Sequence, residues 1–220
     1  MSNEIKPVQS AEIAVANQSP APMTFTQTGD NGTQIGRADV VNNCFNILLA
    51  GLPQTGAGQF DIIGALGRLN CDCYNLFVKA GESFDGSHFT IAKKRSLTEY
   101  TPADTKNEYS SMSTEAIERI KTFPALFASE NDTYRGKNNE GHVAYVGLIT
   151  DIKIQEDDIK FYFCKLLSVS QDLINTMAVE LNLGMPDRFN EMNCTHWTIK
   201  RINLIEELRD EGVQIPILKL

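Results

Sequence analysis

The sequence predicts an α+β fold, with a mostly antiparallel sheet flanked by three or four helices and a disordered N-terminus. Three observations lead to this class. Residues 143–163 alternate apolar and polar side chains around a short acidic turn, residues 168–212 carry apolar residues at helical spacing, and residues 1–22 are rich in Ser, Pro, Ala, Gln and Asn. These patterns indicate paired strands, amphipathic helices and disorder, respectively. We expect a disordered tail over residues 1–22, a small repetitive β element over 23–42 and one α+β domain over 43–220.

The clearest element is a hairpin in the middle of the chain. Between Val143 and Ile154, one face carries Val146, Leu148, Thr150, Ile152 and Ile154, and the opposite face, which includes Ile149, becomes polar towards its end. The acidic residues 156–158 break the run, and residues 159–163 resume it. Residues 124–128 are predicted to form a further strand, since proline is tolerated at the first position of a strand. The pattern leaves open whether the sheet curls into a small barrel.

Composition excludes several classes of protein. The chain has 220 residues, 42% of them hydrophobic, and a net charge of −8. An acidic chain is poorly suited to holding nucleic acid through nonspecific phosphate contacts. The short basic runs 93–95 and 200–201 are candidates for a local basic patch, but the favoured interpretation is that they are solvated. No apolar run reaches the roughly 18 residues that span a bilayer, and five scattered cysteines do not form a secreted disulfide framework. We therefore expect a cytoplasmic protein that does not bind membranes.

A short repeat follows the tail. Residues 26–29 and 33–36 share the pattern T-Q-x-G, seven residues apart, around Asp30-Asn31-Gly32. One interpretation is a single hairpin about this turn. The alternative is a stacking element that joins subunits through polar ladders, and its residues would be Gln27, Gly29, Asn31, Gln34 and Gly36.

The same stretch, residues 27–36, resembles the Q-x-G-D-N-x-T-Q-x-G segments of uncharacterised bacterial proteins from phage-defence and mobile-element loci. The resemblance covers about a dozen residues. It implies a bacterial conflict system as the setting and says nothing about chemistry.

A glycine-rich stretch at residues 47–58 superficially matches a phosphate-binding loop. Gly51 and Gly56 have the required spacing, but Ala57 and Gly58 stand where that loop needs Lys and Ser or Thr. We therefore expect a connector that leads into a helix near residues 60–69, and no nucleotide cofactor.

The remaining segments are assigned from their turn and capping residues. Residues 73–79 and 88–92 are predicted to form a second hairpin, and residues 98–111 a loop. Ser113 is expected to cap a helix that runs to about residue 122. Residues 168–171 are predicted to open a helix that Gly184 ends. A second helix is predicted from about residue 195 to Gly212, and it buries Trp197. A short edge strand is expected at 213–217.

Four residues supply zinc-ligand chemistry: Cys71, Cys73, Cys194 and His196. Structural zinc sites usually separate paired cysteines by two to four residues, and here one residue intervenes. We expect these cysteines to pack as small hydrophobic side chains, with no bound metal. No Asp or Asn is seen to orient His196, so Cys194 and His196 are not predicted to form a nucleophile–base pair.

A metal-dependent nuclease is the second functional hypothesis. Asp151 and Lys153 share one face of a predicted strand, and Glu130 and Asp132 precede them by about twenty residues. This resembles the D…(D/E)-x-K layout of restriction-type nucleases, in which carboxylates hold a metal and lysine lies near the attacking water. The sequence departs from that layout in lacking the Pro-Asp start, in using Asp for Glu and in placing the residues on a hairpin.

The strand pattern of residues 124–164 also resembles SH3-like and Tudor-like barrels. That resemblance implies binding of peptides or modified side chains through exposed aromatics, here Tyr134, Tyr145 and Tyr162. The alternative is that these rings pack across strands. From all these observations, the favoured function is a non-catalytic binding or assembly component of a bacterial anti-phage or mobile-element system, with a protein partner or self-association and no cofactor.

Overall fold

The computed structural model describes residues 61–133, 142–186 and 188–215, all within the compact unit Ala38–Leu220. The repetitive element at 23–42, the glycine-rich stretch at 47–58 and Tyr134 lie outside the described residues, so the predictions made for them stay predictions.

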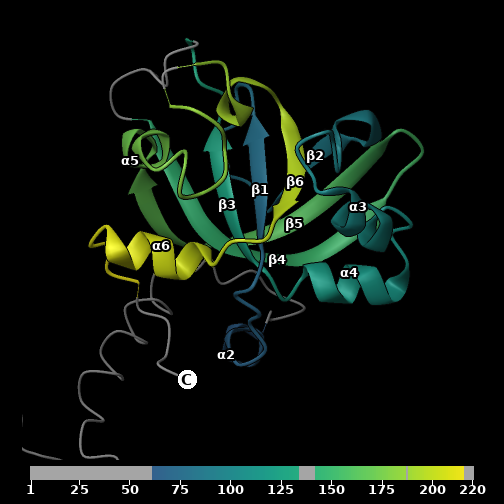
Figure 1. Ribbon diagram of the computed structural model, residues 1–220. Helices are drawn as coiled ribbons and strands as arrows, with labels where there is room; N and C mark the ends of the chain where they lie inside the picture. The colour runs from purple at the N-terminus through teal and green to yellow at the C-terminus, as the bar shows by residue number, and fades with distance from the viewer. Residues whose placement is uncertain (1–60, 134–141, 187, 216–220) are drawn as a thin grey trace, which may run out of the picture. The chain divides into compact units, whose positions relative to one another are not determined.

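The described residues form one mixed sheet of six strands in the order β2-β5-β4-β3-β1-β6 (Figure 1). Only β1 and β3 pair in parallel, and the other neighbours are antiparallel. The prediction of an α+β fold with a mostly antiparallel sheet is therefore confirmed. The strands are β1 (Tyr74–Lys79), β2 (His88–Ala92), β3 (Pro124–Ser129), β4 (Val143–Ile154), β5 (Asp158–Ser170) and β6 (His196–Lys200).

The sheet curls so that its two edges approach each other. Ser96, just after edge strand β2, forms an isolated parallel bridge with Trp197 of the other edge strand, β6. The amide of Leu97 also donates to the carbonyl of Trp197 at 2.8 Å. The segment that follows β2 therefore runs beside β6.

An aromatic core fills the inside of the curl. Phe77 of β1 contacts Phe89 of β2 at 5.1 Å between ring centroids, although three strands separate β1 from β2 in the sheet. Phe127, Phe161 and Trp197 complete the same cluster. Contact between distant strands requires that these rings all lie on the concave face.

A second core covers the opposite face of the central strands. Leu76, Val78 and Leu126 pack there against Ile174 and Leu208. The helices are α2 (Ile62–Leu66), α3 (Ala103–Tyr109), α4 (Thr114–Ile120), α5 (Gln171–Thr176) and α6 (Leu204–Asp210), with 3-10 turns η1 (Lys93–Arg95) and η2 (Glu191–Asn193). In Figure 1, α5 and α6 lie together at the left, away from α3 and α4 at the right. None of the helices in the described ranges has the length and apolar content needed to cross a membrane.

The predicted hairpin is present as β4 and β5, but its two faces are not those expected. Register shifts interrupt the pairing between Val146 and Gly147 and between Ile149 and Asp151. The first shift leaves an extra residue, Leu166, on β5, and the second leaves Thr150 on β4. The second shift reverses the alternation along β4, so Ile149 and Ile152 both enter the aromatic core while Val146 enters the other one. The assignment of Val146 and Ile152 to one face was therefore wrong.

The predicted hairpin of residues 73–79 with 88–92 is also wrong. β1 is buried on both faces and pairs with β3 and β6, whereas β2 alternates exposed and buried residues and pairs with β5. A strand that is buried on both faces lies inside the sheet and pairs with a strand on each side. Both neighbours of β1, the strands β3 and β6, are distant from it in sequence. The glycine-bounded turn between the strands carries Phe84 into the aromatic core.

Two helix predictions and one loop prediction need correction as well. Residues 196–200 form β6 rather than the start of a helix, because Trp197 and Ile199 alternate with polar residues and only α6 is helical beyond them. Helix α5 is capped by Ser170 and ends at Thr176, well before Gly184. The predicted loop at 98–111 contains α3. The cap at Ser113 is confirmed, since its hydroxyl accepts from the amide of Ala116 at 3.2 Å.

Candidate functional site

The site is built on the edge strand β6. Trp197 and Ile199 point into the aromatic core, so the alternate residues His196, Thr198 and Lys200 lie on the other face of the strand. All three are buried, with exposed fractions of 1% or less. A histidine and a lysine at this depth need partners, because an unpaired buried charge is strongly destabilising.

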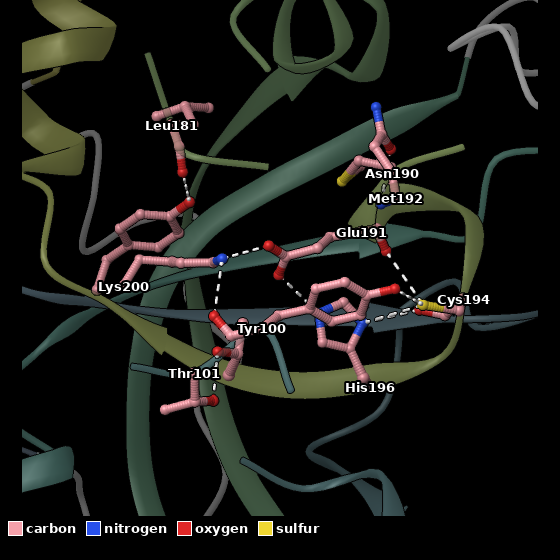
Figure 2. A network of polar contacts seen from close by, with 11 residues as sticks. Tyr100, Thr101, Leu181, Asn190, Glu191, Met192, Cys194, His196 and Lys200 are labelled. Atoms are coloured by element: carbon pink, nitrogen blue, oxygen red, sulfur yellow. Dashed lines mark hydrogen bonds and ion pairs between the residues drawn. The ribbon is translucent and has the colours of Figure 1, made fainter. Parts of the chain in front are cut away.

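Glu191 is the partner of both cations. Its Oε2 lies 3.1 Å from Nε2 of His196, and its Oε1 forms an ion pair with Nζ of Lys200. Figure 2 shows the carboxylate between the two cationic groups. The side chain of Glu191 is itself only 6% exposed.

A capped 3-10 turn positions Glu191. Asn190 Oδ1 accepts from the amide of Met192 at 2.9 Å, and the amide of Asn190 donates to Asn193 Oδ1 at 3.0 Å. These reciprocal bonds fix η2 at both ends. The amide of Asn131 at the end of β3 also donates to the carbonyl of Met192, which ties η2 to the sheet.

His196 is held in its doubly protonated form. Its Nδ1 lies 2.8 Å from the carbonyl oxygen of Cys194, and its Nε2 faces the Glu191 carboxylate. Both neighbours accept hydrogen bonds, so both ring nitrogens must carry protons to satisfy them. Burial alone would lower the pKa of His196, but its hydrogen bonds to the Cys194 sulfur, to Glu191 and to the Cys194 carbonyl raise the pKa to about 9.

Lys200 reaches from the end of β6 to the same carboxylate. Its Nζ also donates to the carbonyl of Tyr100 at 3.3 Å. Burial lowers the pKa of Lys200, and the attraction of Glu191 opposes that effect. With His196 and Lys200 both protonated, one carboxylate faces two positive charges.

Cys194 and Tyr100 form the boundary between this buried cluster and solvent. The sulfur of Cys194 lies 3.9 Å from Nδ1 of His196 and 3.9 Å from the hydroxyl of Tyr100. The ring of Tyr100 packs against the His196 ring, with 5.3 Å between centroids. Burial and the neighbouring Cys194 raise the pKa of Tyr100 to about 12, so its hydroxyl keeps its proton at neutral pH.

A cavity of about 490 Å³ opens onto these residues. Its walls come from η1, from the segment beside β6 and from the loop and strand around η2. They comprise Lys94, Arg95, Thr98, Glu99, Tyr100, Phe189, Cys194 and His196. The cavity is large enough for a small organic ligand.

The structure does not bring the predicted nuclease residues together. Glu130 follows β3 and accepts a hydrogen bond from Thr195 Oγ1 at 2.9 Å, and Asp132 lies two residues further on. Asp151 and Lys153 lie on β4 beyond the opposite end of its pairing with β3. Within the described ranges, no group of three or more His, Cys, Asp and Glu side chains could hold a metal ion.

The four residues with zinc-ligand chemistry, Cys71, Cys73, Cys194 and His196, are also separated. Cys71 and Cys73 lie at the start of β1, near the Lys200 end of β6, because Tyr74 pairs with Lys200. Cys194 and His196 lie at the other end of that ladder. Burial raises the pKa of the Cys71 and Cys73 thiols, which suits the expected role of small packing side chains.

The two described tyrosines of the predicted binding surface lie on different faces of the sheet. Tyr145 packs against the aromatic core, with Nζ of Lys165 at 4.1 Å from its ring centroid. Tyr162 lies on the outer face, between Lys153 at 5.0 Å and Lys160 at 5.3 Å from its ring. They do not form one surface.

The residues that sequence reasoning missed are Glu191, Lys200 and Tyr100. Cys194 and His196 were not predicted to act together, because no Asp or Asn was expected to orient the ring. In the structure the ring is oriented by Glu191, three residues before Cys194. The spacing Glu191-x-x-Cys194-x-His196 was the available signal. Tyr100 is distant in sequence and reaches the site only because the sheet curls.

Neither a protein-family model, nor a curated protein, nor a solved structure matches this chain. A function must therefore be argued from the geometry of the site.

Proposed function

We infer that this domain is a binding module whose pocket beside β6 holds a small ligand through an anionic oxygen group, a phosphate or a carboxylate. The observation that supports this most strongly is the charge of the cavity wall. Lys94, Arg95 and protonated His196 line it, and Glu99 is the only carboxylate among the described residues of its wall. This excess of positive charge occurs in a chain whose net charge is −8.

The buried cluster behind the wall adds to the same imbalance. Glu191 is shared between His196 and Lys200, so it neutralises only one of them. An anion in the cavity would supply the missing negative charge close to His196. Charge-assisted hydrogen bonds to such an anion are stronger than those between neutral groups.

The wall also offers hydrogen-bond donors that have no protein partner. Neither Lys94 nor Arg95 takes part in an ion pair within the described residues. Both side chains are exposed, so an anionic ligand in the cavity could pair with them. The rings of Tyr100 and Phe189 would border an apolar part of the ligand.

This proposal specifies the binding role expected from the sequence. A cytoplasmic location, a bacterial conflict system and self-association through residues 23–42 stay predictions that accompany it.

The proposal is tested by calorimetric titration of the full chain with inorganic phosphate and, separately, benzoate at constant ionic strength. The two anions distinguish a phosphate site from a carboxylate site. The matched variants are Lys94→Gln/Arg95→Gln in the pocket and Arg68→Gln/Lys106→Gln, which removes the same charges from exposed positions outside it. The pocket variant should bind at least about fivefold more weakly, equivalent to roughly 1 kcal/mol, and the control variant should bind as the wild type does.

Equal weakening in both double variants would show that only the net charge matters, and the proposed pocket would be wrong. Saturable binding of neither anion would also refute it.

A further inference from the structure

We propose that Cys194 is a nucleophile that accepts an acyl group from an activated, negatively charged acyl donor, such as a thioester, held in the cavity. This inference rests on the proposed anion pocket, and it assigns chemistry to a side chain that simple binding does not use. Cys194 lines the cavity and is only partly buried.

The side chains around Cys194 follow the order that is found in sites with a cysteine nucleophile. Sγ of Cys194 lies 3.9 Å from Nδ1 of His196, and Nε2 of the same ring lies 3.1 Å from the Glu191 carboxylate. A thiol, an imidazole and an orienting carboxylate in this sequence of contacts is the arrangement that activates cysteine on unrelated folds. Figure 2 shows the imidazole between the sulfur and the carboxylate.

The protonation state of His196 suits this chemistry. Its Nδ1 proton is directed at the Cys194 carbonyl at 2.8 Å and lies beside the sulfur. An imidazolium next to a cysteine stabilises the thiolate, which is the attacking form. The ring then already carries the proton that a leaving group needs.

The charged and titratable groups around the sulfur come from four parts of the chain. Cations outnumber carboxylates among them, which favours an anionic substrate. Lys94 and Arg95 of η1, Glu99 and Tyr100 of the following segment and His196 of β6 line the cavity together with Cys194. The carboxylate of Glu191 from η2 lies on the far side of the His196 ring, where it is paired with Lys200 of β6.

The reaction balances without an oxidant or reductant. The thiolate of Cys194 attacks the carbonyl carbon and forms the new C–S bond. The bond from that carbon to the leaving group then breaks, and the leaving group departs with the electron pair and takes the proton from Nδ1 of His196. The Tyr100 hydroxyl, 3.9 Å from the sulfur, is a side-chain donor close enough to stabilise the oxyanion. The products are an acyl-Cys194 thioester, the protonated leaving group and neutral His196.

The first test compares iodoacetate with iodoacetamide, which differ in charge but alkylate the same group. Rates for each cysteine of the full chain are measured by peptide mass spectrometry at pH 7. Cys71 and Cys73 serve as partly buried internal controls. Cys194 should react at least about tenfold faster than either, and its preference for iodoacetate should exceed theirs by about fivefold or more.

Two variants separate the contribution of His196 to the reactivity of Cys194 from that of Lys94 and Arg95. His196→Gln should slow alkylation of Cys194 by both reagents. Lys94→Gln/Arg95→Gln should abolish the preference for iodoacetate, because it slows the reaction with iodoacetate more than the reaction with iodoacetamide. The second variant changes exposed residues, so the test does not depend on whether the buried His196 variant folds.

The acyl step is tested by intact-mass analysis after incubation with a benzoyl thioester and with its 4-carboxy derivative. The 4-carboxy donor should label Cys194 faster. If Cys194 reacts no faster than Cys71 while phosphate or benzoate still binds, the nucleophile is refuted and the proposed binding function stands. Fast labelling without a preference for the negatively charged reagents would refute the anionic donor and, with it, the charge selectivity of the pocket.

Discussion

Glu191 and His196 form a buried carboxylate–imidazole pair, with 3.1 Å between Oε2 and Nε2 and side-chain exposures of 6% and 1%. The pair is held by the capped turn η2 on one side and by edge strand β6 on the other. Lys200 shares the same carboxylate, so the loss of Glu191 would leave two buried cations without a counter-charge.

Glu191→Gln should therefore destabilise the domain strongly. Removing one partner of a buried ion pair costs about 3–5 kcal/mol because the remaining charge stays buried. Chemical denaturation monitored by the fluorescence of Trp197 measures the change, since this is the single tryptophan of the chain. The double variant Glu191→Gln/Lys200→Met should be less destabilised than the single variant; a double variant at least as unstable would argue against charge as the cause.

Stability should fall as the pH rises towards 9. The pKa of His196 is about 9 in the folded chain, compared with its ordinary value of 6.5. A raised folded-state pKa contributes stability that is fully present below pH 6.5 and is lost as the pH rises through 9. The contribution is on the order of 3 kcal/mol. Denaturant unfolding at several pH values checks it, and the difference between wild type and His196→Gln should shrink over this window. A constant difference would contradict the protonated state of His196.

Gly147→Ala should unfold or strongly destabilise the protein. A Cβ at this position would lie 2.1 Å from the carbonyl oxygen of Cys164, where the register of β4 and β5 shifts. Backbone must move to relieve that contact, so a loss of several kcal/mol is expected, about the upper range for single substitutions. Gly86→Ala is the control, because the atom nearest to its Cβ would be the carbonyl oxygen of His88 at 3.6 Å. Similar melting temperatures for the two variants would show that the close approach does not matter.

The N-terminal repeat is expected to mediate self-association. Deleting residues 1–40 should lower the molecular mass measured by light scattering, because it removes all five residues of the proposed ladder: Gln27, Gly29, Asn31, Gln34 and Gly36. Replacing Gln27 and Gln34 with Ala should act in the same direction. A mass that is monomeric before and after the deletion would refute the assembly role.

Local patterns predicted the parts of the fold whose partners are close in sequence. The hairpin of β4 and β5 and the Ser113 cap each depend on residues within a short stretch, so periodicity and capping chemistry sufficed. The pairings of β1 with β3 and β6 connect residues up to 126 positions apart, as for Tyr74 and Lys200. No local pattern encodes such partners. Without the knowledge that β6 pairs with β1, the sequence of β6 resembles the start of a helix.

The candidate site was predicted only in part, for the same reason. The sequence drew attention to Cys194 and His196 but predicted against a nucleophile–base pair, because Glu191 was not considered as the partner of the ring. Lys200 appeared to be part of a solvated basic run, yet it is 1% exposed, because β6 is covered on both faces. Lys94, Arg95 and Tyr100 join the cavity only through the curl that brings Ser96 beside Trp197.

The most direct test of the anion pocket is an NMR titration of the histidine rings with sulfate at constant pH and ionic strength. The chain has three histidines, and only His196 lines the cavity, so His88 and His142 are controls within the same sample. We predict saturable shifts of the His196 ring resonances, with little change at the other two, and loss of the response in Lys94→Gln/Arg95→Gln. Equal, non-saturating shifts of all three rings, or no shift at His196, would contradict the account.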